Sequence, residues 1–295
     1  MKHSQVITHY SQILMDHGME EQEAQTEVKH ALAKLEKCDI PTLFLKAQLP
    51  VSESVEYRLK AIVDRRITGE PLAYILKERW FMGLPFYVTP DVLIPRQETE
   101  MLAETAIQLI RLEAYARILD ICTGSGCIAV SIARYTRAKV SASDISAKAL
   151  EVALKNAQTN LVNISFFESD LFEAAIGQFD LITANPPYIS KTEIETLQTE
   201  VIDHEPRLAL VAEDNGLAFY KRIAKDAPRY LTPRGTILLE IGNEQGPAVK
   251  KLFEKSGFRD VRVQKDYSGL DRMIIAKNYV KPEKKTAPAA QDAKK

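Results

Sequence analysis

The sequence has few cysteines and no surplus of charge of either sign. Three cysteines in 295 residues, Cys38, Cys122 and Cys127, are too few for a disulfide framework, and their spacing matches no zinc site. The 39 Lys and Arg against 40 Asp and Glu give a formal net charge of -1, so no overall positive field attracts the protein to nucleic acid. We therefore expect a cytoplasmic protein that makes no direct contact with nucleic acid.

Long apolar runs and metal-binding patterns are missing as well. No run approaches the ~18 apolar residues of a membrane span, and His and Asp interrupt the apolar positions of the N-terminal stretch. We expect neither a signal peptide nor a membrane anchor. The five histidines lack the spacing of metal ligands, so we expect no bound metal: they are His3, His9, His17, His30 and His204.

Two patterns with different periods occupy the first third of the chain. Apolar residues recur three and four positions apart in residues 4–68, which predicts a helical bundle over residues 1–70, with Ser52 as a helix N-cap. Residues 71–97 instead carry short apolar runs between Gly and Pro residues. We expect these runs to be extended and to form a β-hairpin linker; they are residues 73–76, 80–82 and 86–88.

Strand and helix patterns alternate through residues 98–280, as in a parallel sheet covered by helices on both faces. The expected strands are residues 118–122, 139–143, 164–168, 180–184 and 236–241, and the helices begin near residues 98, 125, 147, 217 and 248. Two final runs, 262–264 and 273–277, have only a loop between them, so they form an antiparallel hairpin. Six parallel strands and one antiparallel strand are typical of the Rossmann-like class I methyltransferase fold. Residues 281–295 lack large apolar side chains, which predicts disorder.

The segment DICTGSG (120–126) follows the first expected strand of this sheet and opens a helix. Glycines at 124 and 126 allow a ligand to approach the backbone and the helix N-terminus, while Cys122 stands where many methyltransferases have another glycine. Asp144 ends the second strand, where an acid can accept hydrogen bonds from both ribose hydroxyls. Asp170 follows the third strand, beside the expected adenine position. The alternatives are a plain tight turn for the glycines and a helix cap for Asp144 or Asp170.

A second motif, Asn185-Pro186-Pro187-Tyr188, follows the fourth strand, where the order of the sheet reverses and open α/β sheets bind ligands. Methyl transfer to a planar nitrogen requires a site that orients the NH2 group, because its lone pair is delocalised. The Asn185 side-chain oxygen and the Pro186 carbonyl can each accept one N–H. Prolines fix the backbone, and Tyr188 offers an aromatic face. The alternative is an ordinary turn.

Other charged residues near these motifs leave two interpretations open. Arg96, Glu98 and Glu100 could line the mouth of the pocket or form the solvated first turn of a helix. Glu240, near the end of the fifth strand, is expected to be a hydrogen-bonding group rather than a catalyst. Cys122 and Cys127 have no histidine near them in the sequence, so we expect apolar packing rather than nucleophilic chemistry.

Beyond DICTGSGCIAV and NPPYI, several segments extend a likeness over nearly the whole chain: GEPLAYIL (69–76), VTPDVLIPRQETE (88–100), DHEPRLAL (203–210) and EKSGFRDVRVQKDYSGLDR (254–272). Together they resemble the HemK or PrmC family of protein-(glutamine-N5) methyltransferases, which modify peptide-chain release factors.

This resemblance implies S-adenosylmethionine as the methyl donor. The residues it implies for donor contacts are Cys122, Thr123, Gly124, Ser125, Gly126, Asp144, Asp170, Leu171 and Asn185. It implies contacts to the substrate glutamine along Asn185, Pro186, Pro187 and Tyr188, with Asn185, Pro186 and Tyr188 as the catalytic group. The sequence departs from the family at Gln97, usually proline, and in residues 211–217, usually richer in glycine. We expect the latter loop to lie away from the core motifs.

The leading hypothesis is therefore methylation of the glutamine in the Gly-Gly-Gln loop of class I release factors. Methylation of a ribosomal-protein glutamine is a close alternative, and adenine-N6 methylation of nucleic acid is a weaker one because no basic groove is visible. A binding module without activity would be expected to lose Asn185 or Asp144, and both are present. We expect a monomer in which residues 1–70 dock the protein substrate.

Overall fold

The N-terminal helices gather around their own hydrophobic core in this computed structural model, which describes residues 1–280. The helices are α1 (His3–Asp16), α2 (Glu21–Glu36), α3 (Ile40–Leu45) and α4 (Glu53–Arg66). Val6, Leu32 and Leu59 are fully buried between them. The Ser52 hydroxyl accepts a hydrogen bond from the backbone N–H of Val55 at 3.3 Å, so the predicted N-cap of α4 is confirmed.

The linker contains a helix as well as the expected hairpin. Strands β1 (Arg79–Phe81) and β2 (Leu84–Phe86) pair in antiparallel fashion, with Met82 and Gly83 at positive φ in the two-residue turn. The extended run expected at residues 73–76 is wrong, because these residues belong to helix α5 (Leu72–Leu76). Periodicity cannot distinguish helix from strand in so short an apolar run. The strand expected at residues 86–88 is also displaced, because β2 ends at Phe86.

The remaining elements build the α/β sheet, and their bounds are α6 (Gln97–Glu113), β3 (Arg117–Ile121), α7 (Cys127–Tyr135), β4 (Lys139–Asp144), α8 (Ala147–Thr159), β5 (Ile164–Glu168), β6 (Phe179–Ala184), η1 (Glu193–Thr196), α9 (Thr199–His204), α10 (Arg207–Leu210), α11 (Ala218–Asp226), η2 (Ala227–Arg229), β7 (Leu231–Glu240), α12 (Gly246–Ser256), β8 (Phe258–Lys265) and β9 (Asp271–Tyr279). The strand order is β5-β4-β3-β6-β7-β9-β8. Only β9 runs antiparallel to its neighbours among these described strands, so the predicted class I methyltransferase sheet is confirmed.

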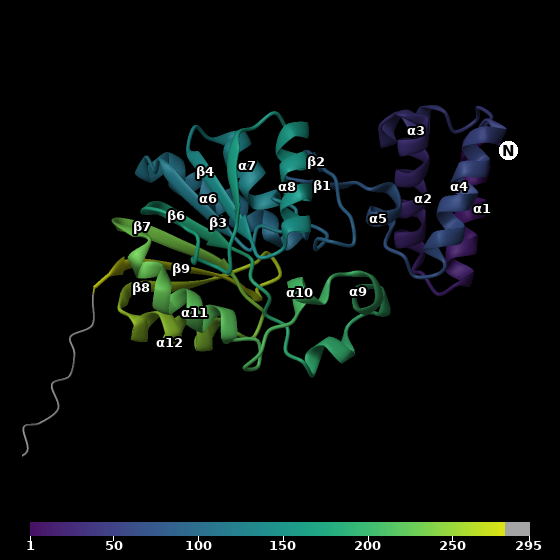
Figure 1. Ribbon diagram of the computed structural model, residues 1–295. Helices are drawn as coiled ribbons and strands as arrows, with labels where there is room; N and C mark the ends of the chain where they lie inside the picture. The colour runs from purple at the N-terminus through teal and green to yellow at the C-terminus, as the bar shows by residue number, and fades with distance from the viewer. Residues whose placement is uncertain (281–295) are drawn as a thin grey trace, which may run out of the picture.

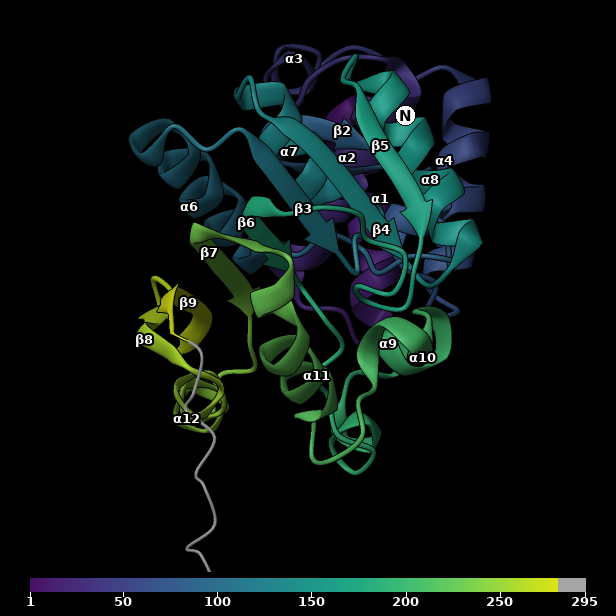
Figure 2. The ribbon, with the colours of Figure 1, turned by 60° about the vertical axis from the view of Figure 1, so that its left-hand side comes forward.

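Helices cover both faces of this sheet, with α6, α7 and α8 on one face and α11 and α12 on the other (Figures 1 and 2). Successive residues of β7 point into opposite cores. Leu238 packs under α6 and α7, whereas Ile237 and Leu239 pack under α11 and α12. The carboxyl ends of the central strands therefore open between two packed layers, and loops at this edge are held on both sides.

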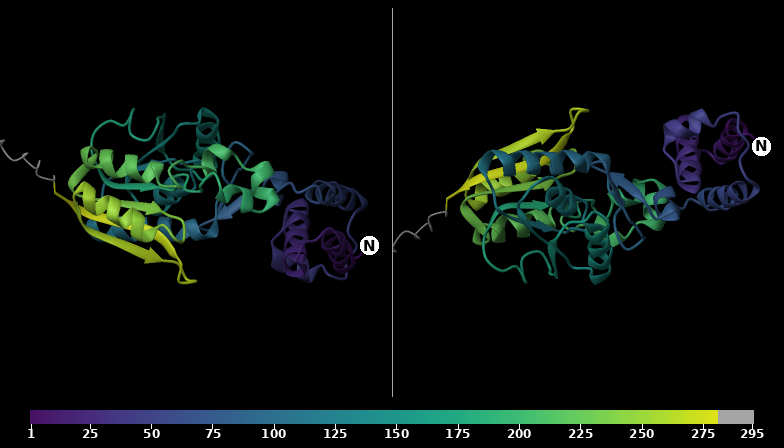
Figure 3. Two further views of the ribbon diagram at one scale, coloured as in Figure 1. Left: turned by 90° about the horizontal axis from the view of Figure 1, so that it is seen from below. Right: turned by 90° about the horizontal axis from the view of Figure 1, so that it is seen from above.

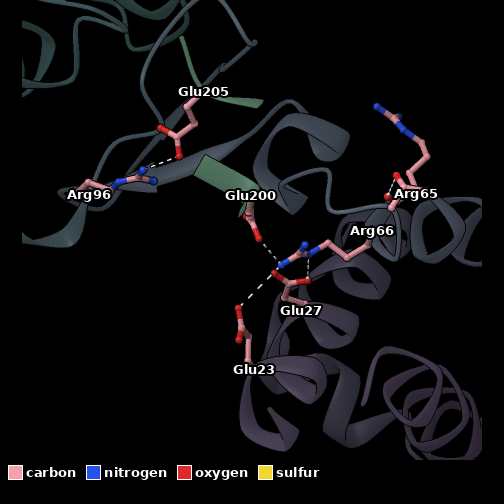
Figure 4. A network of polar contacts seen from close by, with 8 residues as sticks. Glu23, Glu27, Arg65, Arg66, Arg96, Glu200 and Glu205 are labelled. Atoms are coloured by element: carbon pink, nitrogen blue, oxygen red, sulfur yellow. Dashed lines mark hydrogen bonds and ion pairs between the residues drawn. The ribbon is translucent and has the colours of Figure 1, made fainter. Parts of the chain in front are cut away.

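The helical bundle lies at one end of an elongated molecule, set apart from the sheet (Figures 1 and 3). Helices α9 and α10 extend from the side of the sheet toward it. Arg66 at the end of α4, only 7% exposed, pairs with Glu27 of the bundle at 2.7 Å and with Glu200 of α9 at 2.8 Å (Figure 4). An ion pair thus joins the bundle to the segment that borders the site described below.

No helix within residues 1–280 is both long and apolar enough to cross a membrane. The disorder expected for residues 281–295 falls outside the residues that the structure describes.

Asn156, fully buried on α8, fastens the linker to the sheet. Its Oδ1 accepts from the N–H of Tyr87 at 2.6 Å, and its Nδ2 donates to the carbonyls of Tyr87 and Ser125 at 2.9 Å.

Asn156→Leu should lower the free energy of unfolding by about 2–4 kcal/mol, because three backbone groups lose their partner in the interior. Denaturant titration of the full chain measures this loss. Gln158→Leu, on the exposed side of α8, should stay within about 0.5 kcal/mol of wild type, and an equal loss in both variants would contradict the assignment.

Candidate active site

A cavity of about 310 Å³ lies at the carboxyl ends of β3, β4 and β6. The loop after β3 forms its floor, and residues of the linker and of the segment 206–209 close its other sides. The residues predicted for donor contacts that line it are Cys122, Thr123, Gly124, Ser125, Asp144, Asp170, Leu171 and Asn185. The structure therefore brings together segments that are up to about 60 residues apart in the sequence and belong to four strand ends.

Left-handed backbone conformations shape the loop after β3. Cys122 has φ +55°, which explains why glycine is common at this position in other methyltransferases. Gly124 has φ +54°, and an added Cβ would meet no atom within 4 Å, so this position opens to free space. Gly126 does not line the cavity; a Cβ there would lie 3.0 Å from Ala153 Cβ. Gly126 thus allows α7 to begin close to α8.

Asp144 holds this loop from the end of β4. Its Oδ2 accepts from the N–H of Gly124 at 2.8 Å and its Oδ1 from the N–H of Ser146 at 3.0 Å. Burial raises the pKa of the Asp144 carboxyl, and these two N–H groups act in the opposite direction. The N-cap of α8 is Ser146, whose hydroxyl accepts from the N–H of Ala149, so Asp144 is not itself the helix cap. Each carboxylate oxygen can accept a further hydrogen bond, and Asp144 lines the cavity.

Asp120 is a residue whose role the sequence analysis missed. Its carboxyl is 0% exposed and accepts hydrogen bonds from the hydroxyls of Thr123 at 2.6 Å and Thr183 at 2.7 Å. Burial raises the pKa of Asp120 to about 7, against the effect of the two hydroxyls. The signal was present in the sequence, because Asp120 is a lone acid inside an apolar strand, but its partners belong to a loop and to another strand.

Asp170 and the two cysteines show less specific surroundings. Asp170 lines the cavity and pairs with Arg222 of α11 at 2.8 Å. Burial raises the pKa of the Cys127 thiol to about 12 and that of the Cys122 thiol well above its usual value. Both thiols are therefore protonated, as expected for apolar packing rather than nucleophilic chemistry.

The Asn-Pro-Pro-Tyr loop leaves the end of β6 beside this cavity. Asn185 is half-buried, and its Nδ2 donates to the Thr99 hydroxyl at 3.4 Å. Pro186 and Pro187 are buried, and of the two only Pro187 lines the large cavity. A second cavity of about 160 Å³ adjoins the loop, and Asn185, Tyr188 and Glu240 are among its lining residues. Asn185 therefore borders both cavities.

The loop at residues 211–217 packs directly on the segment that follows Asn-Pro-Pro-Tyr, so the expectation that it lies away from the core motifs is wrong. The N–H of Ala212 donates to the carbonyl of Ile189 at 2.8 Å. Gly216 has φ +82°, and a Cβ there would overlap the carbonyl oxygen of Tyr188. The Gln245 side chain donates to the same oxygen at 2.9 Å. Close approach of two loops distant in sequence leaves no periodic pattern, so it could not be predicted.

The charged residues at the start of α6 have different surroundings. Arg96 borders both cavities and pairs with Glu205 (Figure 4), as expected for a residue at the pocket mouth. Glu98 is exposed, and Glu100 accepts from the N–H of Met82 at 2.6 Å, which fits the first turn of a helix. The next buried residue, Thr99, contacts Asn185 but looks in the sequence like an ordinary polar position of a helix. Gln97 is the first residue of α6, the position that favours proline.

The large cavity fits a nucleoside that carries a sulfonium. The open face at Gly124 admits a ligand against the backbone, and the half-buried Asp144 carboxylate lines the same cavity. Within residues 1–280, no group of three or more His, Cys, Asp or Glu side chains is arranged to hold a metal ion.

Two family models match the chain. The methyltransferase small domain matches residues 98–213, and the PrmC N-terminal domain matches residues 5–76. The release factor glutamine methyltransferase of Geobacter sulfurreducens is 39% identical over 88% of this chain and 91% of its own length. The protein of the same name from Bordetella pertussis is 40% identical over 88% of this chain and 96% of its own length.

A solved structure supports the fold separately. A methyltransferase from Pyrococcus furiosus superimposes with a TM-score of 0.51 at 18% identity, covering 76% of this chain and 99% of that one.

Asp144→Ala should weaken S-adenosylmethionine binding by about 1.5–3 kcal/mol, because a carboxylate that accepts from ribose hydroxyls makes charge-assisted bonds. Titration calorimetry measures the change. Glu168 is an exposed acid on β5 that lies opposite Asp144 in the strand register, so Glu168→Ala is a matched control. This variant should bind the donor normally. Unchanged donor affinity in Asp144→Ala would refute this role.

Proposed function

We propose a reaction for this chain, which belongs to the family of release factor glutamine methyltransferases. In this reaction, it transfers a methyl group from S-adenosylmethionine to the side-chain nitrogen of the glutamine in the Gly-Gly-Gln loop of class I release factors. The C–N bond forms as the methyl–sulfur bond of the donor breaks, so the products are N5-methylglutamine, S-adenosylhomocysteine and a proton, which the amide nitrogen releases to water. The observation that carries this proposal is the position of Asn185, which borders both the nucleoside-sized cavity and the smaller one. A carboxamide entering the smaller cavity meets the donor cavity at this residue.

Asn185 and Pro186 orient the acceptor in this reaction. When bound, the donor supplies an electrophilic methyl group on a sulfonium. The Asn185 Nδ2 is occupied by Thr99, so its Oδ1 is the atom left to accept one N–H of the substrate amide. The Pro186 carbonyl accepts the other N–H, and the face of the nitrogen is then turned toward the methyl group. The amide nitrogen becomes acidic only as it is alkylated, so no strong base is needed beforehand.

The other proposed contacts follow the same two cavities. Leu171, Asp170 and the loop from Cys122 to Ser125 hold the donor together with Asp144, while Gly126 shapes the start of α7 behind them and Pro187 keeps the acceptor loop rigid. Tyr188 presents its ring to the planar amide in the smaller cavity. Burial raises the pKa of Tyr188 to about 12, so the phenol is neutral and packs without charge.

The helical bundle is proposed to dock the release factor. The catalytic loop recognises little beyond a carboxamide, so selectivity has to come from a second surface. The separate core of the bundle and its ion-pair contact with α9 support this division of labour. We place the reaction in the cytoplasm, with a monomeric enzyme and a protein substrate; a net charge of -1 favours no direct contact with nucleic acid.

The substrate itself is tested by incubating the full chain with labelled S-adenosylmethionine and three acceptors, namely a release factor, a ribosomal protein and duplex DNA. Mass localisation of the label should find it on the release-factor glutamine. Label on the ribosomal protein or the DNA alone would replace the proposal with one of those substrates.

Asn185→Ala should lower the single-turnover rate by ~10² or more, because the lost oxygen orients the substrate amide. Donor affinity should stay within a few-fold of wild type. Asn185→Asp retains an acceptor oxygen but adds charge, so it separates geometry from charge. A near-normal single-turnover rate for Asn185→Ala would remove this residue from the mechanism.

Deleting residues 1–70 should abolish most methylation of the whole release factor but change methylation of a short Gly-Gly-Gln peptide little. Donor binding and circular dichroism show whether the remaining chain is folded. Glu53→Gln in the full chain, an exposed change in α4, provides a control with the bundle intact. Equal losses with peptide and protein, or an unfolded remainder, would make the bundle a structural support rather than a docking domain.

A further inference from the structure

The mechanism above leaves one buried acid beside the catalytic loop without a role. Glu240, the last residue of β7, is 2% exposed and borders the smaller cavity with Asn185 and Tyr188. Its Oε2 is fully buried and has no hydrogen-bond partner among the described residues. Because an uncompensated buried carboxyl is costly, its retention at this point requires a reason beyond packing.

Three elements bring Glu240, Thr99 and Asn185 together. Leu239 pairs in register with Ala184, so the ends of β6 and β7 place Glu240 next to Asn185. Thr99 lies in the first turn of α6, 2% exposed, and its hydroxyl accepts from Asn185 Nδ2 at 3.4 Å. A hydroxyl that accepts one hydrogen bond can donate its own proton to another acceptor. Oε2 of Glu240 is the nearby acceptor atom that lacks a partner.

We propose that Glu240 and Thr99 are positioning residues that hold the Asn185 amide in one of its two orientations, with Oδ1 toward the substrate glutamine. This proposal rests on the methyl transfer proposed above and names further residues that it needs. Asn185 Nδ2 donates to Thr99, and Thr99 in turn donates to Glu240. Both residues act on the reaction through Asn185.

Electrostatics makes the arrangement selective. A side-chain amide is nearly symmetric in shape, so packing alone cannot distinguish its oxygen from its NH2 group. Rotation of the Asn185 amide by 180° would turn Oδ1 toward the Thr99 hydroxyl and the Glu240 carboxylate. Two acceptor groups would then face each other in a site of low dielectric, which is strongly unfavourable. The wrong orientation would also offer the substrate NH2 group a donor instead of an acceptor.

The orientation should depend on the charge of Glu240. Burial raises the pKa of this carboxyl to about 7, while Thr99, Arg272 and Asn185 act to lower it and Glu98 acts to raise it. Tyr188, Cys127 and Tyr220 also interact with it. Burial raises the pKa values of Tyr188 and Cys127 to about 12 and that of Tyr220 well above its usual value, so all three stay neutral. A protonated Glu240 can instead act as a donor, so it would also stabilise the rotated amide, in which Asn185 Oδ1 points away from the substrate. The rate should therefore rise with pH through about 7 and level off above.

Glu240→Gln tests this with a Gly-Gly-Gln peptide and saturating donor. At pH 8 kcat should fall about tenfold, because the Asn185 amide is no longer held in one orientation. The rise of kcat through pH 7 should also disappear. Donor affinity and the KM for the peptide should change less than about threefold. Glu244→Gln, an exposed acid four residues further on, should keep the wild-type rate and pH profile.

Thr99 gives a second and independent test, which also serves if Glu240→Gln does not fold. Thr99→Val should lower kcat by a similar factor, and Thr99→Ser should restore it because the hydroxyl returns. Thr105→Val, half-buried further along α6, is the matched control. The double variant Thr99→Val, Glu240→Gln should be no slower than the worse single variant within about twofold, because both changes break one chain of hydrogen bonds.

The outcomes separate this proposal from the function on which it rests. If the wild-type chain forms no N5-methylglutamine, both fall. If the wild type is active but Thr99→Val and Glu240→Gln keep its kcat and pH profile, only the positioning role is overturned. A rise in peptide KM with unchanged kcat would also overturn it, since that result would mean that these side chains bind substrate instead of orienting Asn185.

Discussion

The buried carboxyl of Asp120 is the contact on which the geometry of the site depends. It is the penultimate residue of β3 and accepts hydrogen bonds from the hydroxyls of Thr123, in the donor loop, and Thr183, in β6. Thr183 is two residues before Asn185, so a single side chain fixes the donor loop relative to the acceptor loop. Burying this carboxyl is costly, and the two short hydrogen bonds offset that cost. Methyl transfer in line requires just such a fixed distance between two loops.

Hydrogen bonds to side chains continue this control on either side of Asp120. Asp144 reaches back from β4 to the N–H of Gly124, and Gln245 reaches the carbonyl of Tyr188 from the loop after β7. The two loops that meet at the reaction centre are therefore each held by residues from neighbouring strand ends. Because β3, β4, β6 and β7 are consecutive in the sheet, the rigidity of the site derives from the register of the sheet itself.

The parts of this design that follow a local pattern could be predicted from the sequence. Short segments of sequence show the apolar runs of the buried parallel strands. They also show the Gly and Asn-Pro-Pro-Tyr motifs at the ends of these strands. The strand predicted at residues 73–76 was wrong for a local reason, because a run of four apolar residues is too short to show a period. A contact outside the run holds the helix that forms there, since the Tyr74 hydroxyl donates to the carbonyl of Val92. Thr99, Gly216 and Gln245 could not be recognised, because their function exists only through contacts with a loop distant in sequence.

The two cavities are stabilised by different forces. The donor side is closed by buried hydrogen bonds around Asp120 and Asp144. The outer wall of the acceptor side includes Leu197 and Val201, in a segment tied to the rest by the pairs Arg66–Glu200 and Arg96–Glu205. Each pair joins a partly exposed side chain, Glu200 or Arg96, to a buried one, Arg66 or Glu205, so it is open to water on one side only. The donor cavity is thus enclosed by hydrogen bonds at the strand ends, whereas the acceptor cavity is bounded by a segment that long side chains hold through ion pairs, at a greater distance from the sheet.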